Sequence, residues 1–233
     1  MSMKIAQFKN LIQQLPVKQQ SFEIYSKNWK VSNQNEIVNY LFNNNQSITL
    51  SRFDLTNSVY NLEEFVIKTL MWGYPTKGRG TNIDKILEPM NFNKLISLLD
   101  KYSYREITLD QFSNDLNSIP NLGLSTLSKF AYFLDTKVDG LQSLILDRKI
   151  IVILNSSRFQ EFEKLKGIKY NSVNQYYEYL KIMSSISTKL NVMLIKLNCS
   201  FSCLEIIYPN YNEKVFTMRL IKCFLQNELR KLS

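Results

Sequence analysis

Ile119-Pro-Asn-Leu-Gly-Leu-Ser-Thr-Leu-Ser-Lys-Phe-Ala-Tyr-Phe-Leu134 is the stretch that decides the fold of this 233-residue chain. Its proline and glycine predict a tight turn over 120–124, because both residue types interrupt regular structure. Apolar residues recur at helical spacing before the turn, over 109–119, and after it, over 125–134. Ser125 stands where the second helix begins, and serine is a favoured N-cap residue. The stretch therefore predicts two helices joined by a short hairpin.

A second informative stretch is Ser143-Leu-Ile-Leu-Asp-Arg-Lys-Ile-Ile151, in which Asp147 directly precedes a mostly apolar run. An aspartate ahead of a helix accepts backbone N–H bonds at the helix start and stays ionised there. Lys129 lies in the first turns of the predicted hairpin helix, and 147 − 129 = 18 residues separate it from Asp147. Taken singly, such a lysine is usually solvated surface and such an aspartate only a cap. The two residues are informative because they occur together with the hairpin.

The composition limits the chemistry that the chain can use. It has no histidine, which excludes Ser-His-Asp and Cys-His nucleophile systems and histidine zinc sites. Catalysis must therefore use Lys, Asp, Glu, Tyr, Ser or Cys. The three cysteines, Cys199, Cys203 and Cys223, are too few for a four-thiolate iron–sulfur site. We expect them to be buried as small apolar side chains.

Charge and hydropathy indicate the partner and the compartment. Lys and Arg number 29 against 20 Asp and Glu, and the resulting formal net charge of +9 favours nucleic acid as the partner. The alternative is that the lysine excess only reflects an AT-rich genome. No apolar run approaches the length of about 18 residues that a membrane span needs. The start lacks an apolar secretory signal, and the odd cysteine count fits a reducing compartment, so we expect a cytoplasmic protein without a membrane partner.

Helical patterns dominate the rest of the chain, so we expect an all-α, mostly helical fold. The clearest pattern predicts a helix over 57–72, capped by Asn57 or Ser58 and ended by Gly73. The run 192–197 is apolar enough for a strand. Further helical segments are expected over 83–87, 93–99 (after a break at Pro89), 159–165, 173–190, 204–207 and 215–229.

The hairpin, the lysine and the aspartate together resemble the helix-hairpin-helix DNA glycosylases that excise oxidised guanine. In that family a hairpin leads into a helix that carries a lysine, and an aspartate follows in a stretch of the form apolar-apolar-Asp-Arg. The separation of 18 residues is similar to that in the short members. The sequence looks most like compact bacterial proteins with an 8-oxoguanine glycosylase fold, some of which sit in antiviral operons built around cyclic-oligonucleotide signalling. The resemblance is tight over about 117–154, and the first 50 residues match nothing in the family.

This resemblance implies a fold, a partner and a reaction. It implies one domain over 1–233 made of two helical lobes, with double-stranded DNA in the cleft between them and a core at about 109–154. Lys129 would attack C1′ of the modified nucleotide as an uncharged amine and form a Schiff base, shielded by Phe133 four residues later. Asp147 would stabilise the cationic sugar and relay protons. The reaction requires no metal and no organic cofactor.

The resemblance also assigns the hairpin to DNA phosphate. Backbone N–H groups around Asn121, Gly123 and Ser125, at a helix start, would hold one phosphate group. The family's first hairpin glycine is Asn121 in this sequence, and asparagine tolerates the left-handed conformation better than most residues. Arg148 and Lys149 would contact the DNA backbone, although a solvated pair is an equally good interpretation.

Trp72-Gly-Tyr-Pro-Thr-Lys-Gly-Arg-Gly80 holds three of the chain's six glycines and resembles a Trp-Gly-Tyr segment of the compact bacterial relatives. Trp72 or Tyr74 would stack on an extruded base, in a pocket completed by Phe133. Arg79 would contact a phosphate or a base edge. The alternative is that Trp72 belongs to the core and that the following glycine only ends its helix.

Three functions remain open from the sequence. The first is a bifunctional glycosylase/lyase that flips and excises 8-oxoguanine or a similar purine. The second is a non-catalytic nucleic-acid-binding component of a defence complex, in which the same fold binds operon partners or DNA without cutting it. The departure at Asn121 favours this second function. The third is an enzyme for another modified base, such as a deazaguanine, which would differ in its pocket residues.

Overall fold

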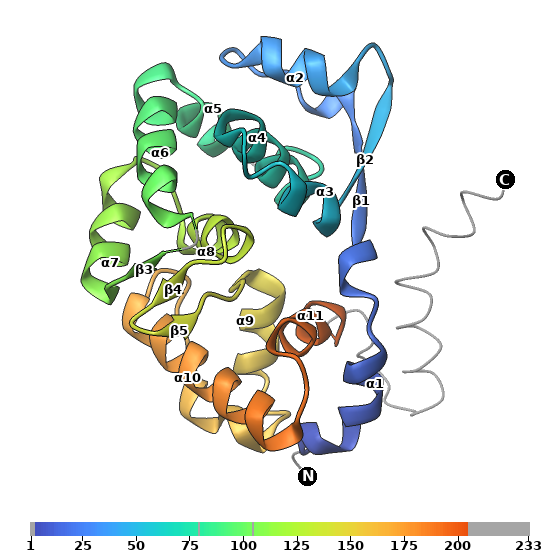
Figure 1. The fold of residues 1–233 in the computed structure, drawn as a ribbon, viewed down its shortest axis with the longest axis vertical. Coiled ribbons are helices and arrows are strands. Elements are labelled where there is room, and N and C mark those ends of the chain that lie inside the picture. The colour runs from blue at the N-terminus through green and yellow to red at the C-terminus, as the bar shows by residue number, and fades with distance from the viewer. Residues whose placement is uncertain (1–2, 79, 104, 205–233) are drawn as a thin grey trace, which may run out of the picture. The chain divides into compact units, whose positions relative to one another are not determined.

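The computed structural model describes residues 3–78, 80–103 and 105–204, and within these ranges the fold is mostly helical, as expected (Figure 1). The chain forms two compact units. The central unit is Ser21–Ser143, and the terminal unit combines the described parts of Met1–Gln20 and Leu144–Ser233. The single domain of two lobes expected from the sequence stays a prediction, and each unit is described by itself.

The central unit begins with a β-hairpin that the sequence analysis did not predict. Strands β1 (Ser21–Tyr25) and β2 (Ser47–Ser51) pair antiparallel over their whole length. The short helices η3 (Ser26–Asn28) and α2 (Asn35–Phe42) lie between them in the chain. Helix α3 (Arg52–Asn57) follows β2 directly, because Ser51 and Asp54 form a reciprocal capping box at its start.

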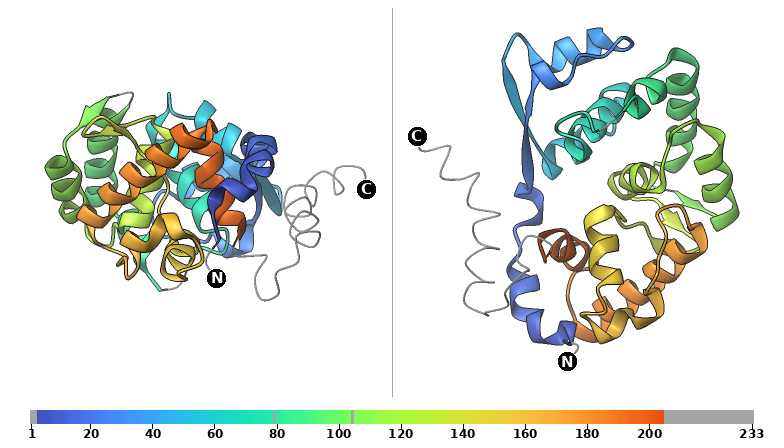
Figure 2. Two further views of the ribbon diagram at one scale, coloured as in Figure 1. Left: turned by 90° about the horizontal axis from the view of Figure 1, so that it is seen from below. Right: turned by 180° about the vertical axis from the view of Figure 1, so that it is seen from behind.

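Five further helices complete the central unit: α4 (Leu62–Gly73), α5 (Asn82–Ile86), α6 (Pro89–Tyr102), α7 (Leu109–Ser118) and α8 (Leu124–Phe133). Helix α4 forms the middle of this unit, and it packs against α6 and α8 (Figure 2). Its residues Phe65, Val66, Ile67, Leu70 and Met71 have no exposed surface. A small sheet of β3 (Glu106–Ile107), β4 (Lys137–Val138) and β5 (Leu141–Gln142) links α6 to α7 and follows α8.

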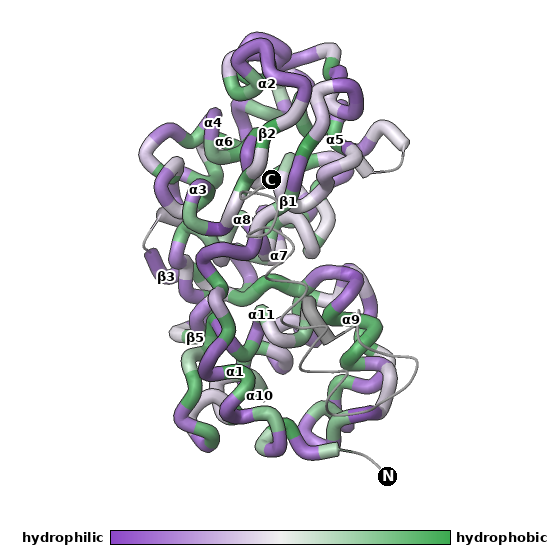
Figure 3. Tube along the Cα trace, turned by 90° about the vertical axis from the view of Figure 1, so that its right-hand side faces the viewer, coloured by the Kyte–Doolittle hydropathy of each residue, from purple (hydrophilic) through white to green (hydrophobic). Residues whose placement is uncertain are grey.

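The terminal unit is built from both ends of the described chain. Its elements are η1 (Ile5–Phe8), α1 (Lys9–Gln14), η2 (Val17–Gln19), α9 (Arg148–Asn155), η4 (Gln160–Leu165), α10 (Val173–Leu190) and α11 (Leu194–Leu204). Edge-to-face contacts among Phe8, Phe159, Phe162 and Phe201 join the two ends. Hydrophilic and hydrophobic residues alternate along most helices, as expected where one helix face is buried (Figure 3).

Several predicted elements are confirmed within a residue or two. The hairpin helices form as α7 and α8, and α10 has the predicted bounds. Among the cysteines, Cys199 is buried with a free thiol as expected. Cys203, Cys223 and the segments after residue 204 lie outside the side chains and residues that the structure describes. No helix in the described residues has both the length and the apolar character needed to cross a membrane.

Other predicted elements are wrong in detail. Gly123, not Ser125, is the N-cap of α8, and Asn61, not Asn57 or Ser58, caps α4. The region 192–197 is not a strand, since α11 begins at Leu194. Pro89 begins α6 instead of breaking a helix, because the first helical position needs no N–H donor.

Candidate functional site

Lys129 is buried inside the central unit. Only 3% of its surface is exposed, although lysine is almost never fully buried unless its charge or its hydrogens are satisfied. Its Nζ donates to the backbone oxygen of Ser125 at 2.9 Å and to Ser125 Oγ at 2.8 Å. The same Nζ lies 5.3 Å from the centroid of the Tyr74 ring. The amine is therefore held by one helical turn of α8 and by an aromatic ring from the end of α4.

Gly73 provides the space that the lysine side chain occupies. A Cβ atom at position 73 would lie 3.1 Å from both Cδ and Cε of Lys129, closer than most side-chain contacts in proteins. Gly73 is the last residue of α4 and does not have a positive φ, so close approach and not backbone conformation requires glycine here. The sequence analysis predicted only that Gly73 ends the helix. Its second role is visible only once α4 and α8 are packed together.

Trp72 and Phe133 belong to an aromatic cluster beside the lysine. Each is 5% exposed, and their rings meet edge to face with centroids 5.5 Å apart. The guanidinium of Arg52, itself 3% exposed, lies 5.0 Å from the Trp72 ring centroid and 6.0 Å from that of Phe133. The sequence analysis did not identify Arg52. The only sequence signal was its position in the first turn after the Ser51 cap.

Tyr74 differs from these two aromatic residues because it is only half-buried. Its hydroxyl is 2.8 Å from Thr126 Oγ1 on α8, which fixes the ring next to the Lys129 amine. The structure thus places Tyr74, and not Phe133, as the aromatic ring in contact with the amine. Arg79, the last predicted member of the base pocket, lies outside the described residues.

The hairpin between α7 and α8 has the tight turn that the sequence predicted. Asn121 has φ +64°, the left-handed conformation for which relatives use glycine. Gly123 has φ −90°, and a Cβ atom there would meet no other atom within 4 Å. Ser125 lies inside α8, and its hydroxyl contacts the lysine amine instead of capping the helix. Asparagine therefore supplies the special backbone conformation of this turn.

Asp147 lies in the terminal unit, at the N-cap of α9. Its Oδ1 accepts the backbone N–H of Ile150 at 3.0 Å, and the residue is half-buried. This is the capping role that the sequence predicted. Arg148 is exposed and Lys149 half-buried in the first turn of the same helix. Each unit therefore brings some of the predicted site residues together, and Lys129 and Asp147 belong to different units.

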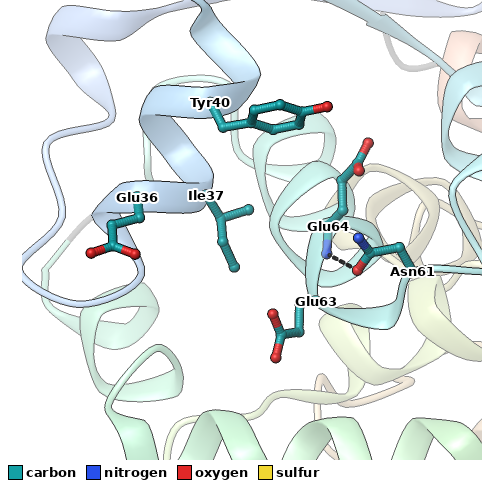
Figure 4. A pocket seen from close by; sticks show the side chains of 6 residues that line it. All are labelled: Glu36, Ile37, Tyr40, Asn61, Glu63 and Glu64. Carbon is teal, nitrogen blue, oxygen red and sulfur yellow. Dashed lines mark hydrogen bonds between the residues drawn. The ribbon is translucent and has the colours of Figure 1, made fainter.

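A separate hollow of about 220 Å³ lies between α2 and α4 of the central unit (Figure 4). It is lined by Glu36, Ile37, Tyr40, Asn61, Glu63 and Glu64. Three carboxylates would repel a DNA phosphate, so this hollow does not suit nucleic acid. The described residues contain no group of three or more acidic or cysteine side chains placed to hold a metal ion.

One comparison with known proteins finds a match. A family described as "Putative 8-oxoguanine DNA glycosylase OGG-like protein" matches residues 15–207. The matched region includes Lys129 and Asp147 and extends well beyond the stretch 117–154 on which the sequence resemblance depends. No curated protein and no solved structure matches the chain.

Proposed function

The chain belongs to the OGG-like 8-oxoguanine DNA glycosylase family, and from this premise we propose that it excises a modified purine from double-stranded DNA with Lys129 as the nucleophile. The observation that carries the proposal is the burial of Lys129, with its amine held between Ser125 and Tyr74. A solvated surface lysine would need neither the space left by Gly73 nor two hydrogen-bond acceptors.

The contacts of the amine suit a nucleophile. An uncharged amine has two hydrogens and one lone pair, and the two Ser125 oxygens can accept both hydrogens. The lone pair then points away from these acceptors and is free to attack C1′. As the new N–C1′ bond forms, the bond to the base breaks, and the base leaves with its electron pair and gains a proton. Opening of the sugar ring gives the Schiff base, from which β-elimination cuts the strand.

Asp147 supplies the second part of the proposed mechanism. Its carboxylate would stabilise the positive charge that develops on the sugar and would relay the protons. The mechanism requires this carboxylate and the Lys129 amine to reach the same nucleotide, although the two residues belong to different units. It calls for no metal ion and no organic cofactor.

The DNA contacts in this proposal follow from charge and exposure. The net charge of +9 favours a polyanion, and the hairpin around Asn121, Gly123 and Ser125 would hold a phosphate. Arg148 and Lys149 would contact the backbone near Asp147. Tyr74, being half-buried, is the best placed of the predicted aromatics to stack on an extruded base. A role in antiviral defence with operon partners stays a prediction.

Borohydride trapping tests the proposal. Borohydride reduces a Schiff base to a stable amine, so the wild type should become cross-linked to a duplex that contains 8-oxoguanine. Lys129→Gln should form no cross-link, whereas Lys101→Gln, which changes an exposed lysine on α6, should cross-link like the wild type. Thermal denaturation of each variant shows whether it is folded.

Two results would change the conclusion. Wild-type protein that forms no cross-link with any purine lesion has no lyase activity. Wild-type protein that binds the duplex without excising its base would fit the non-catalytic alternative. Cross-linking to duplexes with another modified purine, but not 8-oxoguanine, would reassign the substrate and keep the mechanism.

A further inference from the structure

The segment before Asp147 is buried and has no regular structure. Leu144, Ile145 and Leu146 are each at most 1% exposed, and no helix or strand includes residues 143–147. Backbone N–H and C=O groups buried without partners cost free energy, so an irregular buried segment must find its hydrogen bonds elsewhere. The partners of this segment therefore show what determines its position.

Tyr176 on α10 pairs with both backbone groups of Leu144. Its hydroxyl accepts the Leu144 N–H at 3.2 Å and donates to the Leu144 carbonyl at 2.9 Å. The tyrosine has no exposed surface, and 32 residues separate it from Leu144 in the chain. One hydroxyl thus replaces the two partners that a neighbouring strand would provide.

Asn198 on α11 holds the next residue. Its Nδ2 donates to the Ile145 carbonyl at 2.9 Å and to the Tyr179 hydroxyl at 2.7 Å, and it is fully buried. Burial raises the pKa of Tyr179 well above its ordinary value, the hydrogen bond from Asn198 opposes this, and the nearby charges of Tyr176 and Asp147 add to it. The carboxylate of Asp147 is thus close enough to this group of side chains to act on it electrostatically.

We infer that Tyr176 and Asn198 are positioning residues for Asp147: by holding the backbone at Leu144 and Ile145, they fix the start of α9 and the direction of its capping carboxylate. This inference deepens the proposed function, on which its catalytic consequence rests. A misplacement of about 1 Å of a reacting group lowers a rate on the order of a hundredfold. A loosened segment before Asp147 should therefore slow base excision without weakening DNA binding.

Single-turnover base excision tests the catalytic consequence. Tyr176→Phe removes only the hydroxyl, and Asn198→Leu replaces the carboxamide with an apolar side chain of similar size. Each should slow excision by at least about tenfold, while the dissociation constant for lesion DNA changes less than about threefold. Tyr102→Phe is the matched control, since Tyr102 is equally buried and its hydroxyl bonds to Asp115 in the central unit. It should excise at the wild-type rate.

Amide hydrogen exchange tests the positioning itself and does not depend on enzymatic activity. The Ile150 N–H is bonded to Asp147, so it should exchange at least about tenfold faster in Tyr176→Phe and Asn198→Leu when the cap is displaced. The Gly167 N–H is bonded to the Asn155 side chain in the same unit, and its exchange should not change. It therefore separates a local effect from general loss of stability.

The outcomes separate this inference from the proposed function. Unchanged Ile150 exchange in both variants, or equal acceleration of Ile150 and Gly167, would overturn the positioning role. Equal loss of excision in Tyr102→Phe would overturn the catalytic consequence. If the wild type excises no base from any lesion duplex, the proposed function fails, and faster Ile150 exchange alone would still support the positioning of Asp147.

Discussion

Lys129 and Asp147 are held in place by different kinds of contact. The hydrogen bonds of the Lys129 amine go to Ser125, four residues earlier on the same helix. The segment that leads to Asp147 is held by side chains 32 and 53 residues away, on α10 and α11. The comparison teaches that the nucleophile is positioned mainly by local helix geometry and the carboxylate mainly by long-range packing. Variants of each region can test this difference.

Asp147→Asn should have the largest effect. Asparagine is as good an N-cap as aspartate, so α9 should remain capped while the negative charge is lost. Loss of a general acid–base or charge-stabilising group should lower the single-turnover rate on the order of a thousandfold. Asp147→Ala removes both functions and should also lower the thermal midpoint. If Asp147→Asn excises at the wild-type rate, the carboxylate has no catalytic role.

Gly73→Ala should have the next largest effect, because its Cβ would meet Cδ and Cε of Lys129. We expect a loss of about 1–3 kcal/mol in the free energy of unfolding from overpacking. The displaced amine should lower the excision rate on the order of a hundredfold. In a Lys129→Ala background the clash is absent, so the same substitution should cost little stability in thermal denaturation. Equal destabilisation in both backgrounds would mean that Gly73 does not make room for the lysine.

Ser125→Ala should have a smaller effect on Lys129. The backbone carbonyl at position 125 still accepts one hydrogen of the amine, and only the hydroxyl contact is lost. A single such hydrogen bond corresponds to a rate loss of about tenfold in borohydride trapping or single-turnover excision. Ser97→Ala, which changes an exposed serine on α6, serves as the control. A rate equal to wild type would show that the local contacts of the amine do not orient it.

The smallest effect concerns pH and the terminal unit. Burial raises the pKa of Tyr179, so the unfolded chain loses this proton at a lower pH than the folded chain does. The stabilising contribution is complete below the ordinary tyrosine pKa of 10.0 and is lost as the pH rises above it, by at most about 1.4 kcal/mol per pH unit. Denaturant unfolding at pH 9 and pH 11 should show a smaller decrease for Tyr179→Phe than for wild type. Identical decreases would contradict the burial effect on this hydroxyl.

The local patterns of the sequence determined much of this protein. Helical periodicity predicted α7, α8 and α10, and the turn residues predicted the hairpin between α7 and α8. The capping role of Asp147 and the left-handed conformation at Asn121 also followed from residue type alone. These features depend on interactions within a few residues, which a single sequence displays directly.

Tertiary structure alone decided the surroundings of the candidate site. The β1–β2 pairing, the space that Gly73 leaves for Lys129 and the approach of Arg52 to Trp72 all join segments distant in the chain. The bonds from Tyr176 and Asn198 to the segment before Asp147 are of the same kind. No residue pattern announces such contacts, because they form only when whole helices pack and buried backbone groups must find partners.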